Sequence, residues 1–413
     1  MQHRHSITTA LGCILMTFTS IGQALPETLK QHPAQYLVRE DTVGLESYDD
    51  NSTRNQQGKN AQLLEGFSRT LQPELLEQQL ESLVAEVEVP GLSFALINNA
   101  RIVYEFNGGV RNVDSGKPVN QQTMFDAASM SKTVFSAFVL KMVDEGMLSL
   151  DTPLFEYMPY QDIAHDERYK KITARMALSH TTGFPNWRFL TDDGKYVPDK
   201  PLTIAFEPGT QYQYSGEGFQ YLAKVLAHLH ETDLDGLQQI INKTLLSPLK
   251  MESSSFIWTN YLQQHRADGH VQGKINAGWS ITAQNPNFNA AASLQTNARF
   301  YAQFLIGIFE DNYLSHKSYQ AMTSVQSEKL TDKGNSIYKY GLGLYIENLD
   351  GHTFYQHGGF NGSASGLFRY SKEHNVGYVF FTNSEKKNII DKKIMTWLNN
   401  HANRDQSVKA GAL

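Results

Sequence analysis

An extended stretch gives way to a helix within the segment Phe125-Asp126-Ala127-Ala128-Ser129-Met130-Ser131-Lys132-Thr133-Val134-Phe135. From Phe135 the apolar residues recur with the i, i+3, i+4, i+7 spacing of a helix that buries one face. Gly146 follows as a natural left-handed end to that helix. Ser129 and Lys132 are three residues apart, so the spacing places their side chains on one helical face.

A serine at a helix start has two chemical uses. Its backbone N–H points outward with the positive end of the helix dipole, and a lysine one turn later can take its hydroxyl proton. The spacing by itself is common, because any such pair is ordinarily an N-cap serine with a solvated lysine. Ser-x-x-Lys occurs four times in this chain, at Ser129–Lys132, Ser247–Lys250, Ser336–Lys339 and Ser384–Lys387. Only the partners of Ser129 can therefore distinguish it.

Length and charge restrict the class of protein. At 413 residues the chain exceeds the roughly 250–300 residues at which one core stops growing, so we expect two structural lobes. The net charge of −6 and the lack of a polybasic run argue against a nucleic-acid partner and against binding to a membrane surface. No metalloprotease, nucleophile-elbow, P-loop or dinucleotide-binding motif occurs, so we expect neither a metal nor a cofactor.

Residues 1–24 have the pattern of a cleaved signal peptide, with an apolar middle and small residues at Gly22 and Ala24. The apolar run is too short for a stable membrane span. The single cysteine, Cys13, lies inside it, and a lipoprotein anchor there is disfavoured because more of the apolar run follows Cys13 than precedes it. We expect a secreted or periplasmic protein without disulfides, whose residues 25–60 form a flexible arm.

Strand patterns occur near both ends of the chain and helical patterns lie between them. The predicted elements are a helix at Pro73–Val87, strands at Gly91–Ile97, Arg101–Phe106, Gly341–Glu347, Thr353–His357, Gly366–Tyr370 and Gly377–Phe381, and a last helix at Lys387–Asn400. We therefore expect an α/β (α+β) fold, in which an antiparallel sheet flanked by helices carries an inserted, mostly helical domain. The expected bounds are 61–128 and 289–402 for the sheet domain, 129–288 for the helical domain and 403–413 for a tail.

Two further segments could supply partners for Ser129. Tyr214 stands just before an apolar-patterned helix, where its phenol can project into a cleft. A phenol ordinarily loses its proton near pH 10, but an adjacent ammonium lowers that value, so a tyrosine beside a lysine can act as a base. A core tyrosine with a satisfied hydroxyl is the commoner situation.

The second segment is the strand end His357-Gly358-Gly359-Phe360, which a glycine-rich turn follows. Glycines inside a strand usually mark a close approach of backbone or ligand. An acyl group could lie along such a strand, with the Phe360 N–H donating to an oxyanion. The alternative is a bulge and a hairpin turn with a surface histidine.

The order Ser-x-x-Lys, Tyr-Ser-x and His-Gly-Gly resembles the serine β-lactamase and penicillin-binding-protein superfamily, and most of all its branch of class C β-lactamases, esterases and D-aminopeptidases. The resemblance extends over roughly residues 70–400. It includes 142–153, the Leu-Ser-His-Thr segment within 177–185, and 291–297. The family fold, a mixed α/β domain beside a mostly helical one, agrees with the pattern of elements.

The resemblance implies a role for each motif residue. Ser129 would be the nucleophile, and Lys132 and Tyr214 would share the proton transfer, with the choice of base open. The N–H groups of Ser129 and Phe360 would form the oxyanion hole. The strand residues His357, Gly358 and Gly359 would align the acyl group.

Two departures from class C β-lactamases bear on the substrate. Gly216 stands where those enzymes carry the asparagine of Tyr-x-Asn, and His357 stands where they carry a lysine. His357, with an ordinary pKa of about 6.5, would be mostly neutral at pH 7 and would gain charge toward pH 6. Glu217 either replaces the lost amide or occupies the first turn of the next helix, where its charge favours the dipole.

We therefore expect an exported serine hydrolase of the esterase or amidase type, acting through an acyl-enzyme on Ser129. Its partner would be a small-molecule ester, amide or peptide, and the sequence does not predict an oligomeric state. Two alternatives stay open: a peptidoglycan D-amino-acid peptidase or weak β-lactamase, and a penicillin-binding sensor that acylates without turnover.

Overall fold

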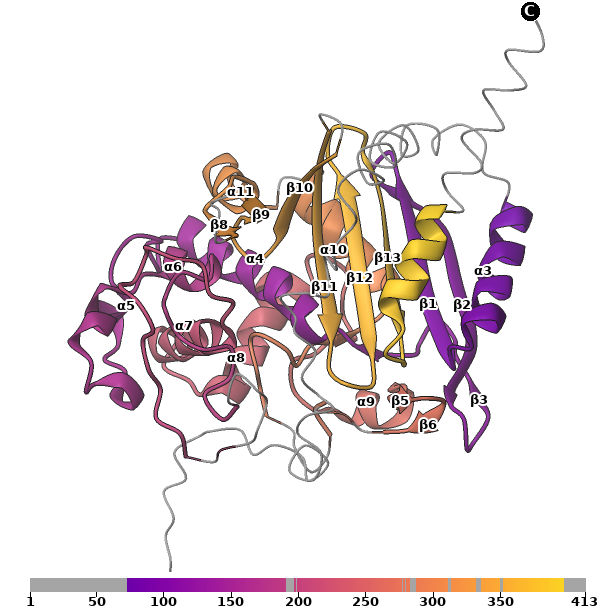
Figure 1. Cartoon of the computed structure of the whole chain (residues 1–413), viewed down its shortest axis with the longest axis horizontal. Coiled ribbons are helices and arrows are strands. Elements are labelled where there is room, and N and C mark those ends of the chain that lie inside the picture. The colour runs from indigo at the N-terminus through magenta and orange to yellow at the C-terminus, as the bar shows by residue number, and fades with distance from the viewer. Residues whose placement is uncertain are drawn as a thin grey trace, which may run out of the picture.

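The structure is a computed structural model, and it describes residues 73–396 except 191–196, 198, 277, 279, 283–286, 311–312, 332–335 and 350–351. The predicted signal peptide, flexible arm and C-terminal tail lie outside the described residues. Figure 1 shows a large sheet on one side of the molecule and a group of helices and loops on the other.

Nine strands of the described chain form one sheet, in the order β3-β2-β1-β13-β12-β11-β10-β9-β8. Every pairing within this sheet is antiparallel. The strands are β1 (Gly91–Asn98), β2 (Arg101–Asn112), β3 (Lys117–Pro118), β8 (Ser327–Leu330), β9 (Ser336–Tyr340), β10 (Tyr345–Leu349), β11 (His352–Phe360), β12 (Ser365–Ser371) and β13 (Val376–Thr382). Because β1 pairs with β13, both ends of the described chain build the sheet, which confirms the predicted fold class.

The central strands alternate between two cores, as the two-residue repeat of a strand requires. Phe94 and Phe380 face a smaller core with helix α3 (Pro73–Val87) and the helix at 387–396. Their neighbours Ala95 and Phe381 face the main core, which includes α10 (Ala298–Phe309). Helices therefore cover both faces of the sheet (Figure 1).

Most of the remaining elements lie between β3 and β8. Two short strands, β4 (Phe125–Asp126) and β7 (Gln295–Thr296), pair with each other. The helices are η2 (Ala128–Met130), α4 (Ser131–Asp144), α5 (Leu154–Tyr157), η3 (Gln161–Ile163), η4 (Glu167–Lys171), α6 (Ala174–Leu178), α7 (Gly216–Leu229), α8 (Leu234–Ile241), η5 (Asn242–Leu246), α9 (Asn260–His265) and α11 (His316–Thr323), and β5 (His270–Val271) pairs with β6 (Lys274–Ile275).

Helix α4 is the element that joins the two parts. It lies between the sheet and the helices α5 to α8 (Figure 1), and most of its residues are buried, including Lys132 and Phe135. Gly146, with φ +74°, follows the helix in the left-handed conformation that the sequence predicts.

Two details of the sheet differ from the sequence prediction. Strands β8 and β9 were not expected, because β8 reads Ser-Glu-Lys-Leu and carries no apolar pattern. The predicted strand Gly341–Glu347 begins only at Tyr345. Gly343 instead takes φ +83° and packs against α4, where its carbonyl accepts a 2.7 Å hydrogen bond from the Thr133 hydroxyl. A Cβ on Gly343 would lie 2.0 Å from Ser136 Oγ, so only glycine allows this contact.

Candidate active site

Ser129 lies in the single turn η2, which runs directly into α4. The preceding strand β4 is fixed by its pairing with β7. Between β4 and the serine, Ala128 adopts φ +44°, a left-handed conformation that costs free energy for any residue with a side chain. Ser129 is 3 % exposed. The fold therefore holds the serine at a strained turn at the start of the helix.

Lys132 is completely buried, and its side-chain nitrogen contacts the serine directly. Its Nζ lies 3.2 Å from Ser129 Oγ and donates a 3.1 Å hydrogen bond to the carbonyl of Ala291. The same nitrogen lies 4.4 Å from the ring centroid of Tyr214 and 6.0 Å from that of Trp187. A buried charge needs such compensation, which carbonyl oxygens and aromatic faces supply. The structure thus brings together the predicted Ser129, Lys132 and Tyr214.

His180 packs against the ring of Tyr214. The two rings are 4.3 Å apart, and Nδ1 of His180 accepts a 3.0 Å hydrogen bond from the backbone N–H of Ser215, the residue after Tyr214. Ser215 in turn caps α7 through its hydroxyl. Burial, followed by the positive charge of Lys132, lowers the pKa of His180 well below its usual value. His180 is therefore a neutral support for the tyrosine.

His357 is buried in β11 and does not present a charge. Its Nδ1 lies 2.7 Å from the carbonyl of Gly358 and so must be the donor, while Nε2, 3.2 Å from the hydroxyl of Tyr340, accepts. Burial and then the charge of Lys132 lower the pKa of His357 to about 3. The expectation that His357 gains charge toward pH 6 is wrong, because this buried site disfavours the imidazolium.

The glycines of β11 allow the strand to lie against the serine turn. A Cβ on Gly359 would lie 2.1 Å from the carbonyl oxygen of Ala127, and one on Gly358 would lie 2.9 Å from Nζ of Lys387. The close backbone approach predicted from these glycines is present. In the register with β12, Phe360 lies opposite Ser365 at the end of the ladder. The strand that ends in Phe360 therefore runs beside the turn that carries Ser129.

Gly216 and Glu217 begin α7 and have separate surroundings. A Cβ on Gly216 would lie 2.6 Å from Cη2 of Trp187, so the indole occupies the space next to this glycine. Glu217 lies in the first turn of α7, which is the alternative in which its charge favours the helix dipole. Its carboxylate forms a 2.7 Å ion pair with Arg188 and also accepts the backbone N–H of Arg188 at 3.0 Å.

The other Ser-x-x-Lys pairs have different environments. Ser247 and Lys250 are both exposed, as are Ser336 and Lys339. Ser384, two residues after the end of β13, and Lys387 are both buried, and the Ser384 hydroxyl lies 3.1 Å from that of Thr382. Ser129 and Lys132 are distinguished by their direct contact, with 3.2 Å between Lys132 Nζ and Ser129 Oγ, and by the ring of Tyr214 beside the same nitrogen.

Several residues around the site carried no distinguishing sequence signal. No sequence motif assigns a role to Trp187, Arg188 or Asp126. Their positions depend on contacts between segments far apart in the chain, which periodicity does not report.

Within the described residues, no group of three or more His, Cys, Asp or Glu side chains could hold a metal ion.

A mixed α/β fold with a buried serine and lysine in contact at a helix start is the arrangement of serine β-lactamases and penicillin-binding proteins. The chain belongs to the Beta-lactamase family, whose model matches residues 76–394. It is therefore a member of the serine β-lactamase and penicillin-binding-protein superfamily.

Individual relatives are distant. The chain is 23 % identical over 227 residues to Protein flp of Staphylococcus aureus (strain MW2), which covers 52 % of this chain and 44 % of that protein. It is 28 % identical over 187 residues to a Beta-lactamase of Pseudomonas fluorescens. This match covers 43 % of this chain and 49 % of that protein. The matches thus span about half the length of these curated relatives.

Two solved structures share the fold. One is the octameric penicillin-binding protein homologue from Pyrococcus abyssi, with a TM-score of 0.63, 22 % identity and coverage of 76 % of this chain and 74 % of that one. The other is the crystal structure of SurE, with a TM-score of 0.61, 22 % identity and coverage of 80 % of this chain and 76 % of that one. No helix in the described part of the chain is long and apolar enough to cross a membrane.

Proposed function

We propose that this protein hydrolyses an ester or amide of a small molecule through an acyl-enzyme on Ser129. The observation that carries the proposal is the 3.2 Å contact between Lys132 Nζ and Ser129 Oγ in a buried pair at the start of α4. Tyr214, whose ring centroid lies 4.4 Å from the same nitrogen, is the second residue that we assign to proton transfer, through its hydroxyl.

The reaction follows from these positions. Ser129 Oγ attacks the carbonyl carbon as its proton passes to Lys132 in the amine form or to Tyr214 in the phenolate form. The backbone N–H groups of Ser129 and Phe360 hold the oxyanion, a contribution of about 3–4 kcal/mol for each donor. Collapse of the intermediate breaks the bond to the leaving group, which takes up the proton. Water then hydrolyses the acyl-enzyme by the same steps.

The surroundings favour an uncharged acyl group. His357 is neutral, so β11 lacks the fixed cation that would attract a β-lactam carboxylate. Trp187 lines the space beside Gly216, where class C β-lactamases place an amide. An ester needs neither contact, and its better leaving group tolerates a site with fewer polar anchors.

Covalent labelling with a fluorophosphonate probe tests the nucleophile. We expect Ser129→Ala to abolish labelling, and Ser247→Ala, Ser336→Ala and Ser384→Ala to retain it. Labelling that persists in a folded Ser129→Ala variant would refute the assignment.

A second experiment separates an enzyme from a sensor that is acylated once. We expect p-nitrophenyl butyrate to give continued turnover after any burst. A single burst equal to the enzyme concentration would instead identify a non-turnover acceptor.

We also propose that the protein is exported after cleavage near Leu25, which mass spectrometry of the extracellular or periplasmic form would test. A diacylglyceryl mass on Cys13 would contradict cleavage there.

A further inference from the structure

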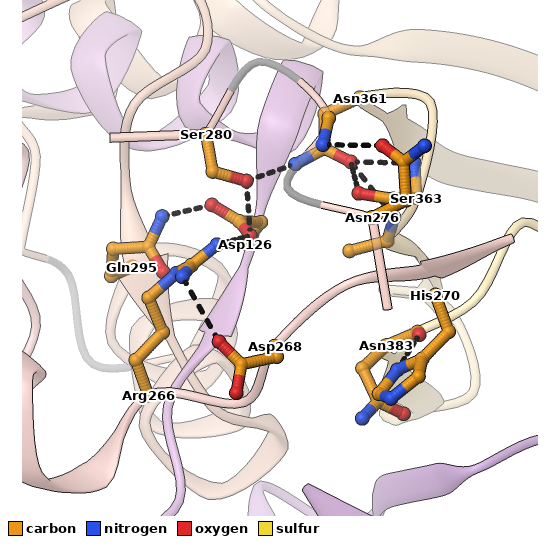
Figure 2. Close-up of polar contacts among 12 residues, drawn as sticks. Asp126, Arg266, Asp268, His270, Asn276, Ser280, Gln295, Asn361, Ser363 and Asn383 are labelled. Carbon is orange, nitrogen blue, oxygen red and sulfur yellow. Dashed lines mark hydrogen bonds and ion pairs between the residues drawn. The ribbon is translucent and has the colours of Figure 1, made fainter. Parts of the chain in front are cut away.

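A buried polar network includes Asp126, three residues before Ser129 (Figure 2). Its centre is the carboxylate of Asp126, which is 2 % exposed. This carboxylate accepts hydrogen bonds from the side chains of Gln295 and Ser280, the latter at 2.6 Å, and pairs with Arg266 at 3.3 Å. Three side chains from separate segments thus fix the orientation of Asp126, two residues before the strained Ala128.

Ser280 extends the network to the turn after β11. Its Oγ donates to Asp126 and also accepts a 2.7 Å hydrogen bond from Nδ2 of Asn361 (Figure 2). The carbonyl oxygen of the Asn361 side chain accepts the backbone N–H groups of Ser363 at 3.1 Å and Ala364 at 2.8 Å. Both ends of the Asn361 amide are engaged, so its orientation is determined.

The two ends of this bridge adjoin the two proposed oxyanion donors. Asp126 precedes Ser129 by three residues, and Asn361 directly follows Phe360. Between the ends, Gly359 packs on the carbonyl of Ala127. A strained turn such as that at Ala128 persists only where surrounding contacts determine it. The bridge supplies contacts of this kind on both segments.

We propose that Ser280 is a positioning residue, which fixes the distance between the N–H groups of Ser129 and Phe360 by joining Asp126 to Asn361. The inference rests on the proposed function, because it assigns the two N–H groups to one oxyanion. Donors stabilise an oxyanion only when they are already aimed at its position, and small misplacements are costly in rate. Arg266 already balances the charge of Asp126, so Ser280 contributes geometry to the site.

The test compares Ser280→Ala with Ser254→Ala. Ser254 is also buried, and its hydroxyl lies 2.8 Å from that of Thr296, so Ser254→Ala loses this buried hydrogen bond whereas Ser280→Ala loses those to Asp126 and Asn361. We expect both variants to have a lower melting temperature, with the larger decrease in Ser280→Ala, so stability is measured separately from rate. We expect kcat on p-nitrophenyl butyrate to fall about tenfold or more in Ser280→Ala alone, with KM little changed.

A thionoester of the same acid tests the oxyanion site itself. Sulfur is larger than oxygen and accepts hydrogen bonds less well, so a well-formed site discriminates against it. We expect the ratio of ester to thionoester rates to fall in Ser280→Ala and to stay at the wild-type value in Ser254→Ala. A loss of stability alone would not change this ratio.

Two further variants keep the test decisive. Ser280→Thr retains the hydroxyl and should restore most of the rate. Asn361→Asp keeps an oxygen for the turn N–H groups but removes the donor to Ser280, so it should lower the rate ratio as Ser280→Ala does. An unchanged ratio in folded Ser280→Ala and Asn361→Asp would overturn the inference. If Ser129→Ala still reacted with fluorophosphonate, the proposed function would fail instead, and the two failures are therefore distinguishable.

Discussion

The indole of Trp187 lies where a side chain at Gly216 would extend: a Cβ built on Gly216 would be 2.6 Å from Cη2 of Trp187 and 2.9 Å from the carbonyl oxygen of Asn186. The indole also lies 6.0 Å from Nζ of Lys132. An aromatic face therefore borders the serine–lysine pair at the position where the Tyr-x-Asn pattern of class C β-lactamases provides an amide. The absence of an asparagine at Gly216 and the presence of Trp187 belong together, because the indole occupies the space that an asparagine side chain would need.

This arrangement predicts that Gly216→Asn is destabilising. Overpacking of this kind typically costs about 1–3 kcal/mol, and displacement of the indole should also reduce ester hydrolysis. Thermal unfolding and p-nitrophenyl butyrate assays measure both effects. Gly116→Asn is the control, because no atom lies within 4 Å of a Cβ at Gly116 and asparagine tolerates its positive φ. Gly216→Asn should cost less stability in a Trp187→Ala background than in the wild type, because the clash with the indole is then absent; equal stability of Gly216→Asn and wild type would contradict the packing argument.

Substrate preference follows from the same site and from His357. We expect a much higher kcat/KM for p-nitrophenyl acetate or butyrate than for a cephalosporin at pH 7. Because the pKa of His357 is about 3, the histidine stays neutral from pH 8 to pH 5, and cephalosporin activity should not rise as the pH falls toward 6. Initial rates over this range decide the point. Equal efficiency on both substrates would mean that another cation serves the carboxylate.

The buried His357 should also make stability depend on pH. Its pKa is about 3 in the folded protein and about 6.5 when unfolded, so the unfolded state binds more protons between these values. The free energy of unfolding therefore decreases as the pH falls through 6.5, by about 2 kcal/mol between pH 7 and pH 5. Urea unfolding of wild type and His357→Gln should show a pH dependence that is weaker in the variant by about that amount. The same pH dependence in both proteins would show that His357 does not titrate on unfolding.

The pair of Glu217 with Arg188 should stabilise the start of α7. Glu217 is 8 % exposed at its side chain and Arg188 is 19 % exposed, so Glu217→Gln leaves a largely buried guanidinium with Asp162 as a remaining carboxylate partner. We expect a loss of about 1–3 kcal/mol in the free energy of unfolding, since the group left behind is desolvated.

The matched control for this prediction is Glu167→Gln. Glu167 pairs with Lys170, and both side chains are well exposed, so its loss should cost less than about 1 kcal/mol. Chemical denaturation of the two variants gives the comparison. Equal small losses in both would show that the Arg188 pair contributes no more than a surface ion pair.

Local sequence patterns were sufficient for part of the site. The helical spacing after Phe135 and the Ser129–Lys132 interval predicted two side chains on one face, and the glycines of β11 predicted a close approach. These features depend on residues within a few positions of each other. For the same reason the alternating strands β1 and β13 were predicted with nearly correct bounds.

The remaining features depend on contacts that no local pattern encodes. His357 has the same sequence neighbourhood whether its strand is exposed or buried, so its pKa could only be derived from the packing of Tyr340 and Lys132 around it. The contact of Trp187 with Gly216 and the Asp126–Ser280–Asn361 bridge join distant segments. Strand β8 was missed because its residues are polar or half-exposed at the sheet edge.

The pairing of Leu92 with Thr382 determines when activity can arise during biosynthesis. Ser129 emerges from the ribosome long before Phe360, and β1 acquires its neighbour β13 only after nearly the whole described chain has been made. Such long-range pairing forms late, because the intervening loop must first be closed. A nascent chain thus carries the proposed nucleophile without the second proposed oxyanion donor, and the proposed hydrolysis requires the last strand to be complete.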